Sequence, residues 1–212
     1  MKAGIIGSGE AGQRLGDGLV ELGYEVMIGS RDSQKLAAWA GKHKKGASAG
    51  SFSEAASYGE LIVIATLWAG TKSAIEMAGG ARNFAGKTVI DVTNPLDFSS
   101  MPPKLAVGFT DSAGETIQRM LPEAKVVKAF NIVGNPLMVH PEFPGGRPTM
   151  FICGNDDGAK KMVSGIAAAF GWESIDAGGI EGSRLLEPLA MLWLNYYFRT
   201  NTGNHAFKLL RK

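Results

Sequence analysis

Short apolar segments alternate with segments of helical periodicity along most of the chain. Five of them are rich in valine and isoleucine and are predicted to be strands: residues 3–7, 25–29, 61–67, 88–92 and 126–130. Between the first two, Ala11, Leu15, Leu19 and Leu22 recur every three or four positions, as on one face of a helix that Gly23 would end. Repeated strand–helix–strand units predict an α/β fold with a doubly wound, mainly parallel sheet of the Rossmann type.

The later part of the chain shows a seam and then one more unit of the same kind. Residues 135–148 hold four prolines and two adjacent glycines, which predicts a loop. After it come a strand over 149–153, a helix around residues 162–170 and a strand over 172–176, and about the last forty residues look helical. We therefore expect a Rossmann domain over residues 1–145 and a smaller C-terminal part over 146–212, a βαβ extension plus helices.

Two local patterns are interpreted as structural. Ser112 followed by Glu115 has the spacing of a helix-starting capping box. The segment 185–198 carries apolar side chains around most of its circumference, so it should be buried against the sheet, a second subunit or a ligand cleft. Just before and within it, Arg184 and Glu187 stand three positions apart and are expected to pair.

Charge and composition narrow the class of partner. The 22 basic and 20 acidic residues give a net charge of +2, which offers no reason to expect a nucleic-acid surface, and no apolar run is long enough to span a membrane. The single cysteine, Cys153, lies in a predicted strand and is expected to be a core thiol, and the start of the chain lacks the pattern of a signal peptide. The histidines are scattered without metal-ligand spacing, so we expect no metal. From the balanced charge we expect a small-molecule partner, and from the missing signal-peptide pattern a cytoplasmic protein.

A glycine-rich loop directly follows the first predicted strand. Its residues are Gly7, Ser8, Gly9, Glu10, Ala11 and Gly12, which fit G-x-G-x-x-G at the start of a helix. In that setting the first glycine permits a tight turn, the second lets a pyrophosphate approach the backbone, and the third allows close packing of helix and strand. The free N–H groups of the helix N-terminus then face the phosphates, so the loop predicts dinucleotide binding.

The end of the second predicted strand indicates which dinucleotide. Sites specific for NAD carry an acidic residue there to bind the ribose hydroxyls, whereas this chain has Ser30 and Arg31. Arginine offers a permanently charged fork to the 2′-phosphate of NADP, and Lys35, one helical turn on, is positioned to face the same group. The alternative is that Arg31 and Lys35 are only solvated at a helix start that Asp32 or Ser33 caps.

The nicotinamide is expected beyond the carboxyl ends of the central strands, where ligands bind in open α/β sheets. Three segments fall there. They are Thr66, Leu67 and Trp68; Thr93, Asn94 and Pro95; and Phe130 with Asn131. The asparagines are candidates to bond the carboxamide or ribose and the aromatic residues to wall the ring, against the alternatives of an ordinary turn and ordinary core packing.

No acid–base pair of familiar catalytic spacing stands out in the sequence. Hydride transfer between two cofactors needs none, because the chemistry belongs to the cofactors while the protein supplies proximity, orientation and exclusion of water. This favours transfer between rings, and no catalytic residue is assigned.

Several of these stretches together resemble the family of coenzyme F420-dependent NADP oxidoreductases. The matching pieces are residues 7–12, 28–31, 128–131, 153–156, 184–189 and 206–210. The resemblance implies a Rossmann domain with a small helical C-terminal part, a deazaflavin in the cleft between them against the nicotinamide, and a homodimer. It also implies that residues 8–11 with Ser30, Arg31 and Lys35 hold NADP. Many members have a proline where this chain has Leu67.

The sequence thus predicts hydride transfer between NADPH and a deazaflavin or flavin-type acceptor. Two other interpretations stay open: an NADPH-dependent reductase of a small imine, ketone or ferric acceptor, and a non-catalytic sensor of NADP redox state.

Overall fold

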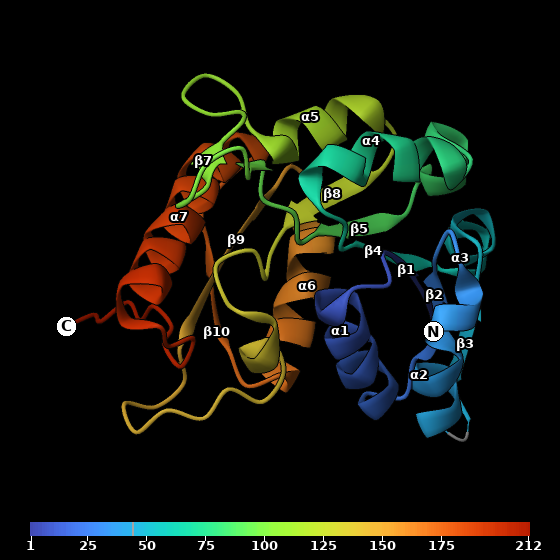
Figure 1. Ribbon diagram of the computed structural model, residues 1–212, viewed down its shortest axis with the longest axis horizontal. Helices are drawn as coiled ribbons and strands as arrows, with labels where there is room; N and C mark the ends of the chain where they lie inside the picture. The colour runs from blue at the N-terminus through green and yellow to red at the C-terminus, as the bar shows by residue number, and fades with distance from the viewer. Residues whose placement is uncertain (44) are drawn as a thin grey trace.

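The fold is built on one eight-stranded sheet with the order β10-β9-β8-β5-β4-β1-β2-β3 (Figure 1). The computed structural model describes residues 1–43 and 45–212. The strands of the sheet are β1 (Lys2–Ile6), β2 (Glu25–Gly29), β3 (Ala47–Gly50), β4 (Leu61–Ile64), β5 (Thr88–Asp91), β8 (Lys125–Lys128), β9 (Thr149–Gly154) and β10 (Glu173–Asp176). A separate two-stranded ribbon joins β6 (Leu96–Asp97) to β7 (Lys104–Leu105).

Neighbouring strands are parallel throughout the sheet except at one junction, where β8 and β9 run antiparallel. The predicted Rossmann-type, mainly parallel α/β sheet is confirmed. The chain reverses its winding between β1 and β4, which are neighbours in the sheet, so a crevice is expected at their carboxyl ends. Because of the antiparallel junction, the carboxyl ends of β9 and β10 point in the direction opposite to those of the other strands.

Helices cover both faces of the sheet, and alternate side chains of β1, β2, β4, β5 and β8 enter two cores. Leu15 and Leu19 of α1 share one core with Val163 of α6. Phe52 of α3 and Ile117 of α5 share the other. The α-helices are α1 (Glu10–Glu21), α2 (Ala37–Lys42), α3 (Phe52–Tyr58), α4 (Trp68–Met77), α5 (Ala113–Met120), α6 (Asp157–Ala169) and α7 (Ser183–Thr200), and short 3₁₀ turns are η1 (Ser33–Leu36), η2 (Ala81–Phe84), η3 (Asn135–Leu137) and η4 (Ile180–Gly182).

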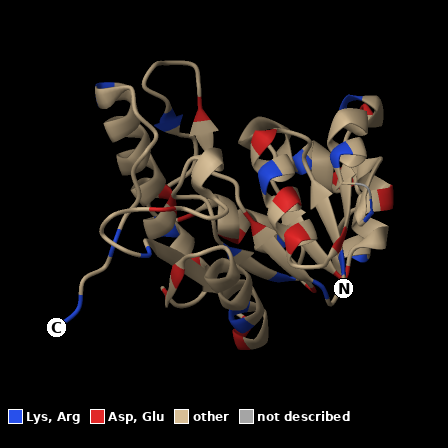
Figure 2. Ribbon diagram, turned by 90° about the horizontal axis from the view of Figure 1, so that it is seen from below, with Lys and Arg blue, Asp and Glu red and all other residues tan. Residues whose placement is uncertain are grey.

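The predicted strands and helices are present, with shorter strands than expected. Residues 65–67 and 129–130 lie in loops beyond β4 and β8. Ser112 does begin α5, since its Oγ accepts a hydrogen bond from the Glu115 N–H at 3.1 Å. Acidic and basic residues are interspersed over the elements (Figure 2). Within the described part of the chain, no helix is long and apolar enough to cross a bilayer.

The C-terminal segment corrects the expectation that the last forty residues are helical. Helix α7 ends where Asn201 adopts a left-handed conformation with φ 52°, and residues 202–212 form an extended tail. The tail packs back on the fold, because Trp193 Nε1 donates to the His205 carbonyl at 2.9 Å and the Thr149 N–H donates to the Phe207 carbonyl at 2.8 Å. These contacts give two carbonyls of the tail hydrogen-bond partners without a helix.

Helix α7 buries one side only, although burial all round was expected. Leu186, Ala190 and Trp193 are buried, whereas Leu185 is 71% exposed and Leu192 56% exposed. The exposed side chains lie seven positions apart and therefore on the same side of the helix.

Cys153 is a core thiol, as predicted. It is fully buried in β9, and burial raises the pKa of its thiol to about 11.

Candidate functional site

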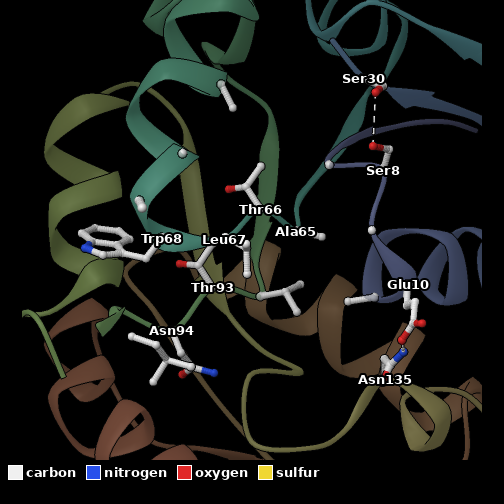
Figure 3. A pocket seen from close by; sticks show the side chains of 18 of the residues that line it. Ser8, Glu10, Ser30, Ala65, Thr66, Leu67, Trp68, Thr93, Asn94 and Asn135 are labelled. Atoms are coloured by element: carbon white, nitrogen blue, oxygen red, sulfur yellow. Dashed lines mark hydrogen bonds between the residues drawn. The ribbon is translucent and has the colours of Figure 1, made fainter. Parts of the chain in front are cut away.

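A cavity of about 880 Å³ runs along the carboxyl ends of β1, β2, β4, β5 and β8 (Figure 3). Residues from the glycine loop line it, together with residues from all three predicted strand-end segments. Of the residues predicted for the site, those on the cavity wall are Gly7, Ser8, Gly9, Glu10, Ala11, Ser30, Arg31, Lys35, Thr66, Leu67, Trp68, Thr93, Asn94, Phe130 and Asn131. Gly12 and Pro95 lie behind the wall. The fold thus brings together segments that are far apart in sequence.

The glycine loop has the geometry that its motif requires. Gly7 adopts φ +131°, and a Cβ there would overlap the Ala65 carbonyl oxygen. A Cβ at Gly12 would overlap the Gly7 carbonyl oxygen, so Gly12 serves the contact between α1 and the loop. A Cβ at Gly9 would meet nothing within 4 Å, and no side chain caps the N-terminus of α1. The loop therefore leaves an open cradle in front of a helix N-terminus, which suits a pyrophosphate.

The wall around Ser30 and Arg31 offers donors suited to a phosphate. Ser30 Oγ donates to Ser8 Oγ at 3.2 Å, which ties the end of β2 to the glycine loop. Asp32 caps η1 by accepting from the Gln34 N–H at 3.2 Å, and Lys35 Nζ lies 3.7 Å from Asp32 Oδ2. The capping predicted as an alternative is present, yet both basic side chains also line the cavity. A hydroxyl, a guanidinium and an ammonium group on one wall fit the 2′-phosphate of NADP.

The opposite end of the cavity is built around two asparagines. Asn94 Nδ2 donates to the Asn131 carbonyl at 2.7 Å, and Asn131 Nδ2 donates to Asn94 Oδ1 at 3.0 Å and to the Leu186 carbonyl at 3.1 Å. Helix α7 is thereby joined to this wall. Phe130, also on this wall, is fully buried and its ring packs against Phe170, with centroids 5.9 Å apart.

Behind this wall lies a fully buried group of charges. Lys128 Nζ is 2.6 Å from Asp91 Oδ2 and 3.0 Å from Glu187 Oε1. The expected pairing of Glu187 with Arg184 is therefore wrong. Arg184 instead bonds Glu115 of α5, with Nε to Oε2 at 2.8 Å. Neighbours on a helix can be drawn apart in this way when partners from other elements are better placed.

Sequence reasoning missed part of the wall. Most of the omissions are apolar, among them Leu96 and Phe98 in and after β6, Val133 just before the proline-rich loop and Met138 within it; the polar ones are Asp32, Ser73 and Asn135. Asn135 Nδ2 donates to Glu10 Oε2 at 2.6 Å across 125 positions of sequence. Residues 96–98 directly follow Thr93, Asn94 and Pro95, a segment that was predicted for the site. This proximity in sequence is the only indication that they also line the cavity.

The ionisable side chains that line the cavity, among the residues that the structure describes, are Glu10, Arg31, Asp32 and Lys35. All belong to the glycine loop or to the segment after β2, whereas Thr93, Asn94 and Trp68 lie on the other side of the cavity (Figure 3). No three His, Cys, Asp or Glu residues within this described set are grouped to hold a metal ion. The cavity can therefore bind phosphates at one end and a neutral, planar group at the other.

The known proteins that are similar to this chain include reductases and NADP oxidoreductases. Residues 2–95 match the family model described as "NADP oxidoreductase coenzyme F420-dependent". The F420-dependent NADP reductase of Methanocaldococcus jannaschii is 30% identical over 205 residues, covering 91% of this chain and 90% of that protein. Metalloreductase STEAP3 of Rattus norvegicus is 32% identical over 193 residues, and this chain spans only 37% of its length.

A crystal structure of a candidate F420-dependent NADP reductase from Arthrobacter sp. FB24 matches with a TM-score of 0.92 and 40% identity, over 99% of each chain. An imine reductase from Streptomyces aurantiacus shares the fold at a TM-score of 0.68 with 17% identity, over 94% of this chain and 65% of that one.

Proposed function

Since the chain belongs to the family of coenzyme F420-dependent NADP oxidoreductases, we propose that it transfers a hydride between NADPH and coenzyme F420. Family membership makes the protein an NADP-dependent oxidoreductase. The deazaflavin as its acceptor, and the residue roles below, are our proposal.

The wall residues divide the work of holding NADPH. Ser30, Arg31 and Lys35 bind the 2′-phosphate, and the N-terminus of α1 binds the pyrophosphate across Gly9. Thr93, Asn94 and Asn131 lie beside the nicotinamide and its ribose. Leu96 and Phe98 exclude water from the face where the second ring stacks.

The placement of charge in the cavity carries the proposal. Reduction of an imine or a ketone places the hydride on carbon and requires a proton donor next to the imine nitrogen or carbonyl oxygen. The ionisable side chains on the described wall all stand at the phosphate end. The nicotinamide supplies a hydride, and a deazaflavin takes it up together with one proton from water. Orientation and dryness are then the chain's contribution, consistent with a wall made of amides, hydroxyls and apolar groups.

We further propose that the exposed side of α7 forms a homodimer contact. Leu185, Leu192 and Tyr196 are 71%, 56% and 51% exposed and follow one side of the helix. Light scattering should give twice the chain mass, and Leu192→Glu should give the single-chain mass.

We also propose that the chain divides into a cofactor-binding domain over residues 1–145 and a smaller part over 146–212.

Stopped-flow oxidation of NADPH against a panel of acceptors tests the function. We expect rapid turnover with coenzyme F420, and slow or no turnover with FAD, ferric citrate and a cyclic imine. Phe98→Ala should raise the KM for coenzyme F420 and leave the Kd for NADP⁺ within about twofold of the original value, because the two ligands contact different parts of the wall.

Other outcomes would replace the proposal. Turnover with ferric citrate but not coenzyme F420 would point to metal reduction, the activity in the name of the STEAP3 relative. Tight NADP⁺ binding without turnover of any acceptor would make the protein a redox sensor.

A further inference from the structure

Three ionisable side chains meet in the interior between β5, β8 and α7. Lys128 and Asp91 are fully buried and Glu187 is 1% exposed. Lys128 Nζ contacts Asp91 Oδ2 at 2.6 Å and Glu187 Oε1 at 3.0 Å, and it donates to the Thr93 carbonyl at 2.7 Å. The ammonium group thus donates a hydrogen bond to the Thr93 carbonyl and lies within ion-pair distance of both carboxylates.

The surroundings keep Lys128 charged. Burial alone would lower the pKa of Lys128, but the attraction of Asp91 and Glu187 outweighs burial and raises it above the ordinary lysine value. Burial raises the pKa of Glu187, and Lys128 together with the N–H groups of Ala113 and Gly114, each 3.0 Å away, acts against that rise. Since apolar residues often fill such a space with equal or better stability, the stability of the fold does not by itself account for the group.

What the charged group holds is the wall of the cavity. Asp91 Oδ1 accepts from the Thr93 N–H at 2.9 Å and from Thr93 Oγ1 at 2.7 Å. With the bond from Lys128 to the Thr93 carbonyl, each polar atom of Thr93 is fixed by the group. The next residue, Asn94, is locked to Asn131, and Asn131 is bonded to the Leu186 carbonyl, adjacent to Glu187 on α7.

We propose that Lys128, Asp91 and Glu187 are positioning residues that set the pose of the nicotinamide. They act through Thr93, Asn94 and Asn131, the part of the wall that faces the nicotinamide if the proposed function holds. Helix α7, from the C-terminal part of the chain, thereby controls the distance over which hydride moves. The phosphate end of the cavity, built on β1, β2 and α1, does not depend on them.

The test compares a ligand that carries the nicotinamide with one that lacks it. Lys128→Met keeps an unbranched side chain that is one heavy atom shorter and removes all three donors. We expect the affinity for NADP⁺ to fall toward that for 2′-phospho-ADP-ribose, while the affinity for 2′-phospho-ADP-ribose stays within about twofold. In single-turnover experiments, the hydride-transfer rate should fall by at least about tenfold, because small misplacements of the reacting atoms have effects of this size.

The matched control is Lys87→Met. Lys87 is a partly buried lysine whose Nζ, like that of Lys128, donates to a backbone carbonyl, here that of Ala56 at 2.6 Å, but it lies away from the cavity. We expect this variant to change neither ligand's affinity nor the transfer rate. Equal losses for both ligands in Lys128→Met, with an unchanged transfer rate, would show a purely structural role and overturn the proposal.

If Lys128→Met does not fold, Glu187→Gln tests the same idea with a side chain of equal size. It should weaken NADP⁺ selectively over 2′-phospho-ADP-ribose, and unchanged selectivity would refute the proposal. The binding comparison needs no acceptor. Failure of the wild type to reduce coenzyme F420 would therefore reject the proposed function alone. Failure of the variants to weaken NADP⁺ selectively over 2′-phospho-ADP-ribose would reject the role of the positioning residues.

Discussion

Ser30 Oγ donates a hydrogen bond to Ser8 Oγ at 3.2 Å, so the end of β2 and the glycine loop are joined at the point where the 2′-phosphate is proposed to bind. Replacing Ser30 with aspartate puts a carboxylate there, which repels a phosphate and can accept from ribose hydroxyls. We expect Ser30→Asp to lower NADPH affinity by about tenfold or more and to improve NADH relative to NADPH. Fluorescence titration of both cofactors measures this, with Ser30→Ala separating charge from the lost hydroxyl.

Arg31 should account for much of the preference for the phosphorylated cofactor. A charged hydrogen bond contributes about 1.5–3 kcal/mol, so Arg31→Ala should weaken NADPH binding roughly tenfold to a hundredfold. NADH binding should change little, because NADH lacks the phosphate. Arg82→Ala, an exposed arginine outside the cavity, serves as the control. Equal losses for both cofactors would contradict the assignment of Arg31.

Gly9 offers a variant that separates ligand binding from folding. Its φ of −71° suits any residue, and an added Cβ meets no protein atom within 4 Å. We expect Gly9→Ala to leave the Tm unchanged and to weaken both NADPH and NADH, since the methyl group would occupy the pyrophosphate's place. Gly41→Ala, on an exposed helix with equally open space, should affect neither cofactor. A Gly9→Ala variant that binds both cofactors normally would argue against the cradle.

The bond between Glu115 and Arg184 predicts a dependence of stability on pH. Hydrogen bonds from Arg184 hold the pKa of Glu115 below its ordinary value of 4.5. A carboxyl whose pKa is lowered on folding stabilises the protein above its unfolded-state pKa, and this contribution is lost as the pH falls through the lowered value. Glu115→Gln should therefore lower the Tm at pH 7, and the difference from wild type should shrink once the pH drops below about 4.5.

The control for that measurement is Glu123→Gln, at an exposed position. Thermal melts followed by circular dichroism between pH 3 and pH 7 suffice. A difference that stayed constant over this range would mean that Glu115 acts by packing and not by charge.

Periodicity predicted most of the fold because most strands here are continuous apolar runs and most helices carry one apolar face. It failed where that signal is weak. Strand β3 has the sequence Ala-Ser-Ala-Gly, which pairs with β2 through its backbone yet carries no large apolar side chain. Strands β6 and β7 have two residues each, too few to show any alternation.

The glycine loop and Ser30 were readable from sequence because their chemistry depends on neighbours in the chain. The charged group around Lys128 was not readable, because its partners lie 37 positions before it and 59 after it, and a lysine ending an apolar strand looks like a solvated one. Spacing on α7 suggested that Arg184 and Glu187 pair with each other, whereas α5 and β8 supply their actual partners.

At Leu67 the sequence differs from that of many relatives, but the backbone conformation is one that their residue would also adopt. The chain has leucine where many relatives have proline, but Leu67 adopts φ −64°, the value that a proline ring imposes. The loop before α4 thus keeps a conformation open to either residue, and the Leu67 side chain is 77% exposed where it lines the cavity.

The contact between Lys128 and Glu187 also bears on how the protein is made. Strand β8 is synthesised well before α7, so Lys128 lacks its Glu187 partner until α7 has been made. A product cut short before residue 187 would retain Lys128 with only Asp91 to oppose it. It would also lack the carboxylate that accepts hydrogen bonds from the Ala113 and Gly114 N–H groups at the start of α5. A chain that ends before α7 therefore lacks one of the two acidic partners of its buried lysine. We expect such chains to be less stable and to be recognised by cellular quality control.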